Sequence, residues 1–194
     1  MTTNHSIMQL LIAALILGAS SVFAHDPKGH PDPMVTTLEP LKGAEFEQTF
    51  LQEMIQHHRG GIEMAKLVSS HTQRPELQQF AAKMISMQQA EIEKMTGWLK
   101  EWHHDSPKEA ANAASHQKMQ SEMAKLQTRR DAAFDESFLD MMSQHHDSAV
   151  EMAEQAGTKA THDELKQLAA KMAKDQREEI KQLKSWGKSW FGPV

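Results

Sequence analysis

The sequence is dominated by an internal repeat: the phrase MIQHHRGGIEMA at residues 54–65 returns as MMSQHHDSAVEMA at residues 141–153. Aligned at an offset of 88 positions without a gap, residues 46–102 and 134–190 agree at 23 of 57 positions. An internal repeat constrains the architecture before any other signal, because both copies must fold in the same way. Each copy carries paired histidines and methionines at the same helical spacing.

Both copies show the apolar periodicity of two long helices, and no segment alternates like a strand. The expected helices span residues 44–70, 75–102, 131–156 and 161–190, with a short helix at 115–126. Each long helix has one apolar stripe, so one hairpin cannot bury its own apolar face, whereas two hairpins can cover each other. The predicted fold class is therefore all-α, a four-helix bundle over residues 44–190 from two repeated helix hairpins, 44–102 and 131–190, joined by a linker at 103–130.

The N-terminal segment differs from the repeats in composition. Residues 1–24 contain no charged side chain, and the apolar stretch of residues 7–23 ends at the small residue Ala24, which is typical of a signal peptide cleaved after Ala24. An uncleaved anchor is the alternative, although 17 apolar residues are short for a membrane span. Residues 25–43 hold four prolines and two glycines and predict a flexible His/Pro arm without a helix. We expect a periplasmic or secreted protein.

Composition excludes several kinds of chemistry. The chain has no cysteine, so it has neither disulfides nor thiolate ligands nor a thiol nucleophile. Its formal net charge of −5 and the absence of a basic stripe argue against nucleic acid as a partner. The chain has 14 methionines, and their thioether sulfurs are the softest metal ligands available to it.

A helical wheel predicts a polar layer inside the bundle. His58 falls in the middle of the apolar arc of its helix, while His57 falls on the flank near Met64. The expected members of the layer are Glu47, Asp135, His58, His146, Gln88, Gln176, Glu91 and Glu179. Burying polar side chains without partners is costly, so their recurrence in phase indicates that they meet one another. The recurring Trp98, Trp102, Trp186 and Trp190 predict packing caps that close each hairpin, and Thr161 with Glu164 predicts a capping box.

The spacing around the histidine pairs suggests a metal site. Residues at i, i+3 and i+4 share a helix face, so Met54 can share a metal ion with His57 or His58. Thioethers beside imidazoles form a ligand set suited to copper or silver. The competing interpretation is a structural polar network in the core. A third interpretation is a mixed arrangement, in which His58 and His146 are structural while His57 and His145 lie at the surface with Met64 and Met152.

The pattern of both halves resembles that of the domain of unknown function 305 family. The stretches that carry the resemblance are EQTFLQEMIQHHRGGIEMA and AAKMISMQQAEIEKMTGWL, with DESFLDMMSQHHDSAVEMA and, more loosely, AAKMAKDQREEIKQLKSWG. The resemblance implies an exported ferritin-like four-helix bundle that binds copper and, in some members of the family, acts in copper tolerance. The matching motif positions are Met54, His57, His58, Met64, Met142, His145, His146 and Met152.

Further candidate ligands lie outside the repeats. His116, Met119 and Met123 share one face of the short helix expected in the linker, where an exposed face would favour transient copper capture. His25 would be the first residue after signal cleavage, and its amine and imidazole together can chelate Cu(II).

The sequence therefore predicts a copper-binding protein, not an enzyme, that serves in copper buffering, transfer or tolerance. Cu(I) is the favoured ion, and Cu(II) and Ag(I) are the alternatives. A ferritin-like di-metal oxidase is a second hypothesis, although Gln88-x-x-Glu91 stands where such sites use Glu-x-x-His. A structural or interaction bundle without metal is a third. Expected partners are metal ions and other periplasmic copper-handling proteins, and a homodimer is compatible with the flank histidines.

Overall fold

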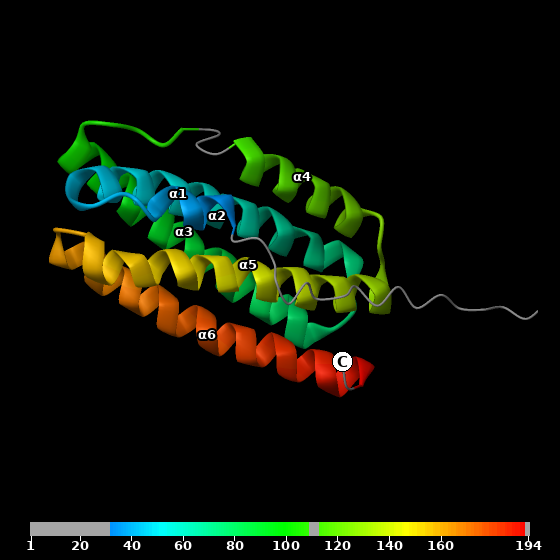
Figure 1. Cartoon of the computed structure of the whole chain (residues 1–194). Coiled ribbons are helices and arrows are strands. Elements are labelled where there is room, and N and C mark those ends of the chain that lie inside the picture. Colours follow the sequence, from blue (N-terminus) through cyan, green and yellow to red (C-terminus); the bar gives the residue numbers. More distant parts are fainter. Residues whose placement is uncertain (1–31, 109–112, 193–194) are drawn as a thin grey trace, which may run out of the picture. The chain divides into compact units, whose positions relative to one another are not determined.

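The structure is a computed structural model that describes residues 32–108 and 113–192, and within these residues every regular element is a helix (Figure 1). The helices are α1 (Pro33–Leu38), α2 (Gly43–His71), α3 (Pro75–His103), α4 (Ala113–Gln127), α5 (Asp131–Lys159) and α6 (Asp163–Phe191). The all-α prediction is confirmed, and the four long helices agree with the predicted spans to within three residues. The predicted signal peptide and His25 lie outside the described residues.

The two hairpins, α2–α3 and α5–α6, pack together through their first helices (Figure 1). Helix α2 contacts α5 along the centre, α3 lies on α2, and α6 lies on α5. The N-terminal half of α2 shares a hydrophobic cluster with the C-terminal half of α5, so these two helices run antiparallel. The repeat therefore places its two copies around an approximate twofold axis.

Two hydrophobic clusters hold the bundle, one toward each end. Phe46 and Phe50 stack in the first cluster with ring centroids 5.7 Å apart, and Phe134 and Phe138 stack in the second at the same distance. All four rings are fully buried. A fully buried side chain of this size contributes about 1.5–3 kcal/mol to stability. The polar layer lies between the two clusters.

Helix α1 corrects the prediction that residues 25–43 form no element. The Asp32 carboxylate accepts a hydrogen bond from Met34 N at 2.9 Å and so caps the helix, and Pro33 occupies its first turn. Met34, Val35 and Leu38 are buried in the first hydrophobic cluster. The proline-rich composition concealed a short capped helix whose apolar side the bundle covers.

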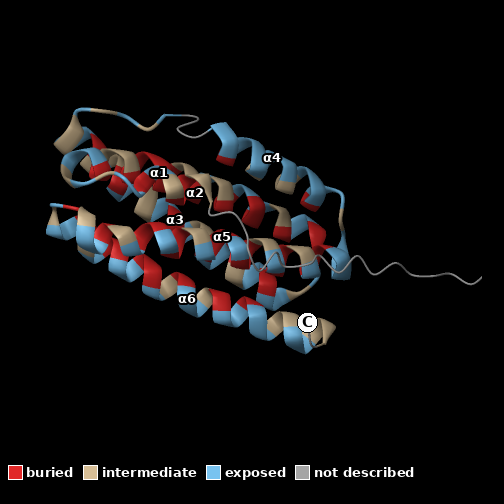
Figure 2. Ribbon diagram, in the orientation of Figure 1, coloured by how far each residue is buried: buried red, intermediate tan, exposed pale blue. Residues whose placement is uncertain are grey.

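Helix α4 confirms the short helix predicted in the linker and lies against α2 and α5. Most of its residues are exposed, as the contrast with the largely buried α2 shows in Figure 2. Met119 is instead partly buried against α2, and its sulfur lies 2.9 Å from the position that a Cβ at Gly60 would take. Helix α4 thus approaches the backbone of α2 where a glycine leaves room. No helix in the described part of the chain is long and apolar enough to cross a membrane.

Glu47 and Asp135 lie at the interhelical turns, not in the central polar layer, which corrects their predicted positions. The Glu47 carboxylate accepts hydrogen bonds from the backbone N–H groups of Thr161 and His162, from the Thr161 hydroxyl and from His162 Nδ1, at 2.6–2.8 Å. The Thr161–Glu164 capping box is therefore also wrong, because the Thr161 hydroxyl donates to Glu47. Asp135 accepts from Arg74 Nε at 2.8 Å in the equivalent turn between α2 and α3.

The tryptophans join the two hairpins as well as packing along their own helices. Trp102 stacks on His162 with ring centroids 3.9 Å apart, and the Arg74 guanidinium lies 4.0 Å from the ring centre of Trp190. His162 and Arg74 occupy equivalent positions in the repeat. Each turn is thus held by a carboxylate, a basic side chain and a tryptophan, with both the carboxylate and the tryptophan coming from the other hairpin.

Candidate metal centre

His57 of α2 and His145 of α5 stack face to face on the approximate twofold axis. Their ring centroids are 3.6 Å apart, with 12° between the planes. Their exposed fractions are 2% and 8%, so the alternative that places them at the surface is wrong. A helical wheel of α2 alone puts His57 on a flank, but α5 covers that flank.

Both stacked imidazoles are neutral. Burial lowers the pKa of His57 well below its ordinary range, and the neighbouring His145, His58 and His146 lower it further. Burial and the nearby His146 and His58 lower the pKa of His145 in the same way. A neutral imidazole keeps a nitrogen lone pair that can bind a metal ion.

The two rings differ in their hydrogen bonds. His145 Nε2 donates to the His57 carbonyl oxygen at 3.1 Å, which leaves His145 Nδ1 as the lone-pair nitrogen. Neither ring nitrogen of His57 has a hydrogen-bond partner. A Cβ at Gly61 would lie 2.9 Å from His145 Nε2 and from Gln88 Oε1, whereas the equivalent position is occupied by Ala149. The absence of a methyl group at Gly61 therefore makes room for the His145 ring. His57 is left with two ring nitrogens that have no hydrogen-bond partner.

His58 and His146 are fully buried and each faces a glutamate. His58 Nε2 donates to Glu91 of α3 at 2.8 Å, and His146 Nε2 lies 2.9 Å from Glu179 of α6. These pairs confirm the predicted central layer for the four residues. Gln88 and Gln176 are buried beside them, and the side-chain oxygen of each lacks a partner.

A pocket opens beside the stacked histidines, under α1 and α4. His57, His145, Met34, Met119 and Met141 line it, and its free space is about 30 Å³. The rest of the lining is polar or charged and includes Asp32, Glu122 and Lys118. The pocket joins two neutral imidazoles and three thioethers, which is a donor set that favours Cu(I) or Ag(I). Its size suits an ion with one or two waters better than an organic ligand.

Two of these methionines were missed by the sequence reasoning. Met34 comes from the segment predicted to form a flexible arm. Met141 stands where the first repeat has Glu53, so the repeat itself gave no signal. The spacing of Met141 four residues before His145 could have indicated it, since such residues share a helix face.

The other predicted thioethers lie in the core. Met54 and Met152 belong to the first hydrophobic cluster and Met64 and Met142 to the second, and all four are fully buried. They border the histidine layer from both ends of the bundle. In the core they pack as apolar side chains, and a role as ligands stays a prediction for them.

The candidate ligands on α4 do not act together in this structure. Met119 reaches the pocket, but His116 is exposed and its Nε2 accepts a hydrogen bond from Gln120 Nε2 at 2.8 Å. Met123 packs against the second hydrophobic cluster. Among the residues that the structure describes, no three His, Asp or Glu side chains gather closely enough to hold a metal ion, so a site in this region depends on methionine.

The duplicated hairpins and the buried histidine pairs define a class of helical bundle, and comparison with known proteins assigns its family. The model of the family described as Domain of unknown function (DUF305) matches residues 24–99 and 88–187. The chain belongs to the DUF305 family. No match was found among curated proteins.

Several solved structures have the same fold. CopM in its Cu(I)-bound form is 30% identical, with a TM-score of 0.67 over 75% of this chain and 98% of CopM. CopM in its Ag-bound form is 29% identical, with a TM-score of 0.66 over 75% of this chain and 97% of CopM. A DUF305 protein of Streptomyces coelicolor, named as a candidate secreted protein, is 25% identical, with a TM-score of 0.63 over 71% of this chain and 89% of its own.

Proposed function

We propose that this protein binds copper, with Cu(I) as its favoured ion, at the pocket beside His57 and His145. The observation that carries the proposal is the set of donors that meet there. Two buried neutral imidazoles, one with no hydrogen-bond partner on either nitrogen, face a pocket lined by three methionines. Leaving buried polar atoms unpaired costs about 1–3 kcal/mol each, and a metal ion that accepts the one lone pair of the neutral His57 ring would offset part of that cost.

The proposed ligands are His57 and His145 with thioethers from Met34, Met119 and Met141. His145 would use Nδ1, because its Nε2 is engaged with the His57 carbonyl oxygen. His58 and His146 are proposed to support the site from the bundle interior, since His58 Nε2 donates to Glu91 and His146 Nε2 lies 2.9 Å from Glu179. Four core methionines are proposed as further candidate ligands if the core side chains rearrange around a bound ion: Met54, Met64, Met142 and Met152.

The chemistry of the donors supports Cu(I) over Cu(II). Thioethers are soft ligands that select Cu(I), and Ag(I) has similar softness. The similarity to CopM, which has been solved with Cu(I), Cu(II) and Ag bound, supports a copper-related function for this chain as well. Without thiolate ligands, the site is expected to exchange its ion with partner proteins.

We propose that the protein acts outside the cytoplasm, in copper buffering, transfer or tolerance. The apolar segment before Ala24 has the composition of an export signal. The Streptomyces relative is also named for secretion. Binding and release are sufficient for this role, and we assign no catalytic step to the site. The di-metal oxidase finds no support from the described residues, because no cluster of three His, Asp or Glu side chains is available in them.

An anaerobic Cu(I) competition titration against a chromophoric chelator tests the proposal. The full chain should take up at least one copper ion per molecule from the chelator. The matched variant His57→Leu/His145→Leu should take up at least one ion fewer. A chain that takes up no copper, or a variant with unchanged stoichiometry, would contradict the proposal.

A further inference from the structure

A single carboxylate, that of Asp32, joins α1, α4 and α5 around the pocket described above. Its Oδ1 caps α1 by accepting from Met34 N, and it also accepts a hydrogen bond from Ser115 Oγ of α4 at 3.3 Å. Its Oδ2 lies 3.5 Å from Lys118 Nζ of α4 and accepts from Ser148 Oγ of α5 at the same distance. All five residues line the pocket. We call Asp32 with Ser115, Lys118 and Ser148 the Asp32 latch.

The contacts of the latch to α4 are weak. Hydroxyl hydrogen bonds usually measure about 2.5–3.0 Å, so the bond from Ser115 at 3.3 Å is long. The Lys118 side chain is 52% exposed, and an ion pair in such a position is screened by water and contributes little free energy. The latch therefore favours the closed position of α4 but can release the helix at low cost.

Helix α4 is anchored unevenly along its length. At its C-terminal end, Leu126 is fully buried in the second hydrophobic cluster. At its pocket end, the buried residue is Ser115 of the latch, and Met119 lies against the backbone of α2 at Gly60. The rest of the helix is largely exposed, and segments with few buried contacts open locally at low free energy. The pocket end of α4 can thus lift while Leu126 stays in place.

Lifting α4 would change both the access to the pocket and its set of donors. His57 and His145 are buried beneath the cover, and a free space of about 30 Å³ leaves no room for a chelator or a partner side chain beside a bound ion. Met119 belongs to α4 and is also a proposed ligand. Movement of α4 therefore withdraws one sulfur from the ion and exposes the ion in the same step.

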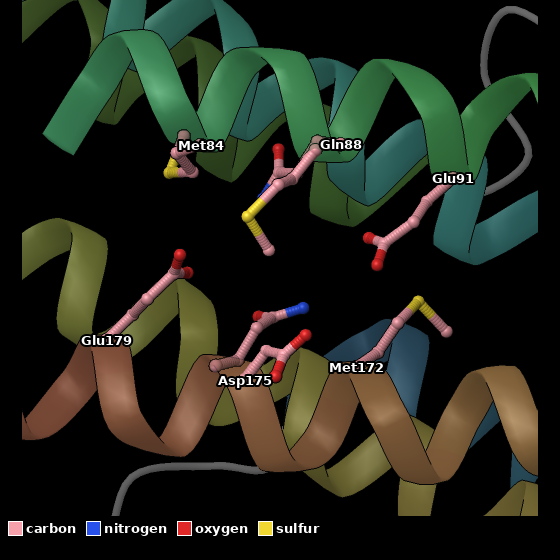
Figure 3. Close-up of a pocket in the computed structure, with 8 residues that line it drawn as sticks. Met84, Gln88, Glu91, Met172, Asp175 and Glu179 are labelled. Carbon is pink, nitrogen blue, oxygen red and sulfur yellow. The ribbon is translucent and has the colours of Figure 1, made fainter. Parts of the chain in front are cut away.

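The space between α3 and α6 has no such cover (Figure 3). The described residues that line it all come from these two helices, among them Met84 and Glu91 of α3 and Met172 and Glu179 of α6. A covering helix held by a polar latch is thus a feature of the pocket that contains the stacked histidines.

We propose that α4 is a lid over the pocket beside His57 and His145, and that Asp32 is the positioning residue that holds the lid closed. Opening of the lid sets the rates at which the ion enters and leaves, whereas the imidazoles and thioethers set the affinity. The inference rests on the proposed function for the identity of the ion.

Two variants break the latch from opposite sides. Ser115→Ala/Lys118→Gln removes both contacts from α4 and leaves the cap of α1 intact. Asp32→Asn keeps an oxygen for the cap, because Asn and Asp are equally good at this position, but it removes the charge that attracts Lys118. Ser121→Ala/Lys125→Gln makes the same exchanges at exposed positions of α4 and is the matched control.

Hydrogen–deuterium exchange of the metal-free full chain tests the lid without any ion. We expect the amides of residues 116–123 on α4 to exchange roughly threefold faster or more in both latch variants than in the wild type. The control variant should match the wild type, and the amides of residues 54–65 on α2 should be unchanged in all four proteins. Unchanged exchange on α4 in either latch variant would overturn the lid.

Stopped-flow transfer of Cu(I) to and from a chromophoric chelator, without oxygen, tests the effect of the lid on the ion. Uptake and release should both accelerate roughly threefold or more in the two latch variants. Uptake by Asp32→Asn separates a lid from electrostatic attraction, because losing a negative charge alone would slow the approach of a cation.

The failure of the lid and the failure of the proposed function give different results. Uptake that is slower or unchanged in Asp32→Asn, with normal Cu(I) binding by the wild type, would overturn the lid while the proposed function stands. A wild-type protein that takes up no Cu(I) would overturn both.

Discussion

The imidazole rings of His57 and His145 stack with their centroids 3.6 Å apart, although the residues are 88 positions apart in the sequence. The stack joins equivalent positions of the two repeats across the α2–α5 interface. Duplication has therefore built a pair of buried, neutral imidazoles that neither copy could enclose alone.

Replacing His57 by leucine should leave the metal-free protein about as stable as the wild type, within about 1 kcal/mol. The substitution removes two buried nitrogens that have no partner, which offsets the loss of ring stacking. His58→Leu is the matched comparison, and we expect it to lose roughly 2 kcal/mol or more because Glu91 would be left without its imidazole. Urea unfolding of both variants measures the difference. Equal losses in the two would show that His57 is a structural residue.

Gly61→Ala should weaken copper binding and lower stability by roughly 1 kcal/mol. The added methyl group would lie 2.9 Å from His145 Nε2 and Gln88 Oε1, so His145 must move away from the His57 carbonyl oxygen. Gly157→Ala is the control, because nothing lies within 4 Å of the Cβ position there. In a helix that exchange should stabilise by up to about 1 kcal/mol. Thermal unfolding and copper titration of both variants provide the test, and identical behaviour would contradict the close approach at Gly61.

Most of the fold could be predicted from sequence because helical periodicity is local and the repeat shows it twice. The errors all concern contacts between distant segments. A wheel of α2 could not show that α5 covers His57. Glu47 accepts a hydrogen bond from Thr161, 114 positions away, whereas the helical wheel placed it in the central polar layer. The pocket methionine Met34 was missed because prolines around it obscured a helix that is stabilised by packing on the bundle.

The turn held by Glu47 should make the stability of the protein depend on pH. Burial alone would raise the pKa of Glu47, but hydrogen bonds from His162 and Thr161 outweigh it and hold the pKa below the ordinary value of 4.5. The unfolded chain then takes up this proton at higher pH than the native protein. The stability that Glu47 contributes is present above pH 4.5 and is lost as the pH falls below it.

Glu47→Gln isolates this contribution. We expect the variant to lose about 2 kcal/mol at pH 7, because its amide group meets the same donors without a charge. The difference from the wild type should shrink below pH 4.5. Glu45→Gln, on the exposed first turn of α2, is the control and should show neither effect. A difference that is constant from pH 7 to pH 3 would contradict the role given to the carboxylate.

The equivalent turn, between α2 and α3, should require the guanidinium group of Arg74 and not only a positive charge. Arg74 donates to the buried Asp135 carboxylate and also covers Trp190. Arg74→Lys keeps the charge but loses the planar stacking, so we expect roughly 1 kcal/mol of destabilisation. Arg74→Met should lose more, about 3 kcal/mol, because Asp135 then remains buried and unpaired. Chemical denaturation gives both values, and a lysine variant less stable than the methionine variant would contradict this order.

The most direct measurement is the position of copper in crystals of the Cu(I)-loaded protein, located by anomalous scattering at the copper edge. We expect a peak bonded to His57 and to at least one sulfur of Met34, Met119 or Met141, in the pocket under α1 and α4. Copper bound only elsewhere, with His57 still free of any ligand, would contradict the assignment of this pocket as the copper site.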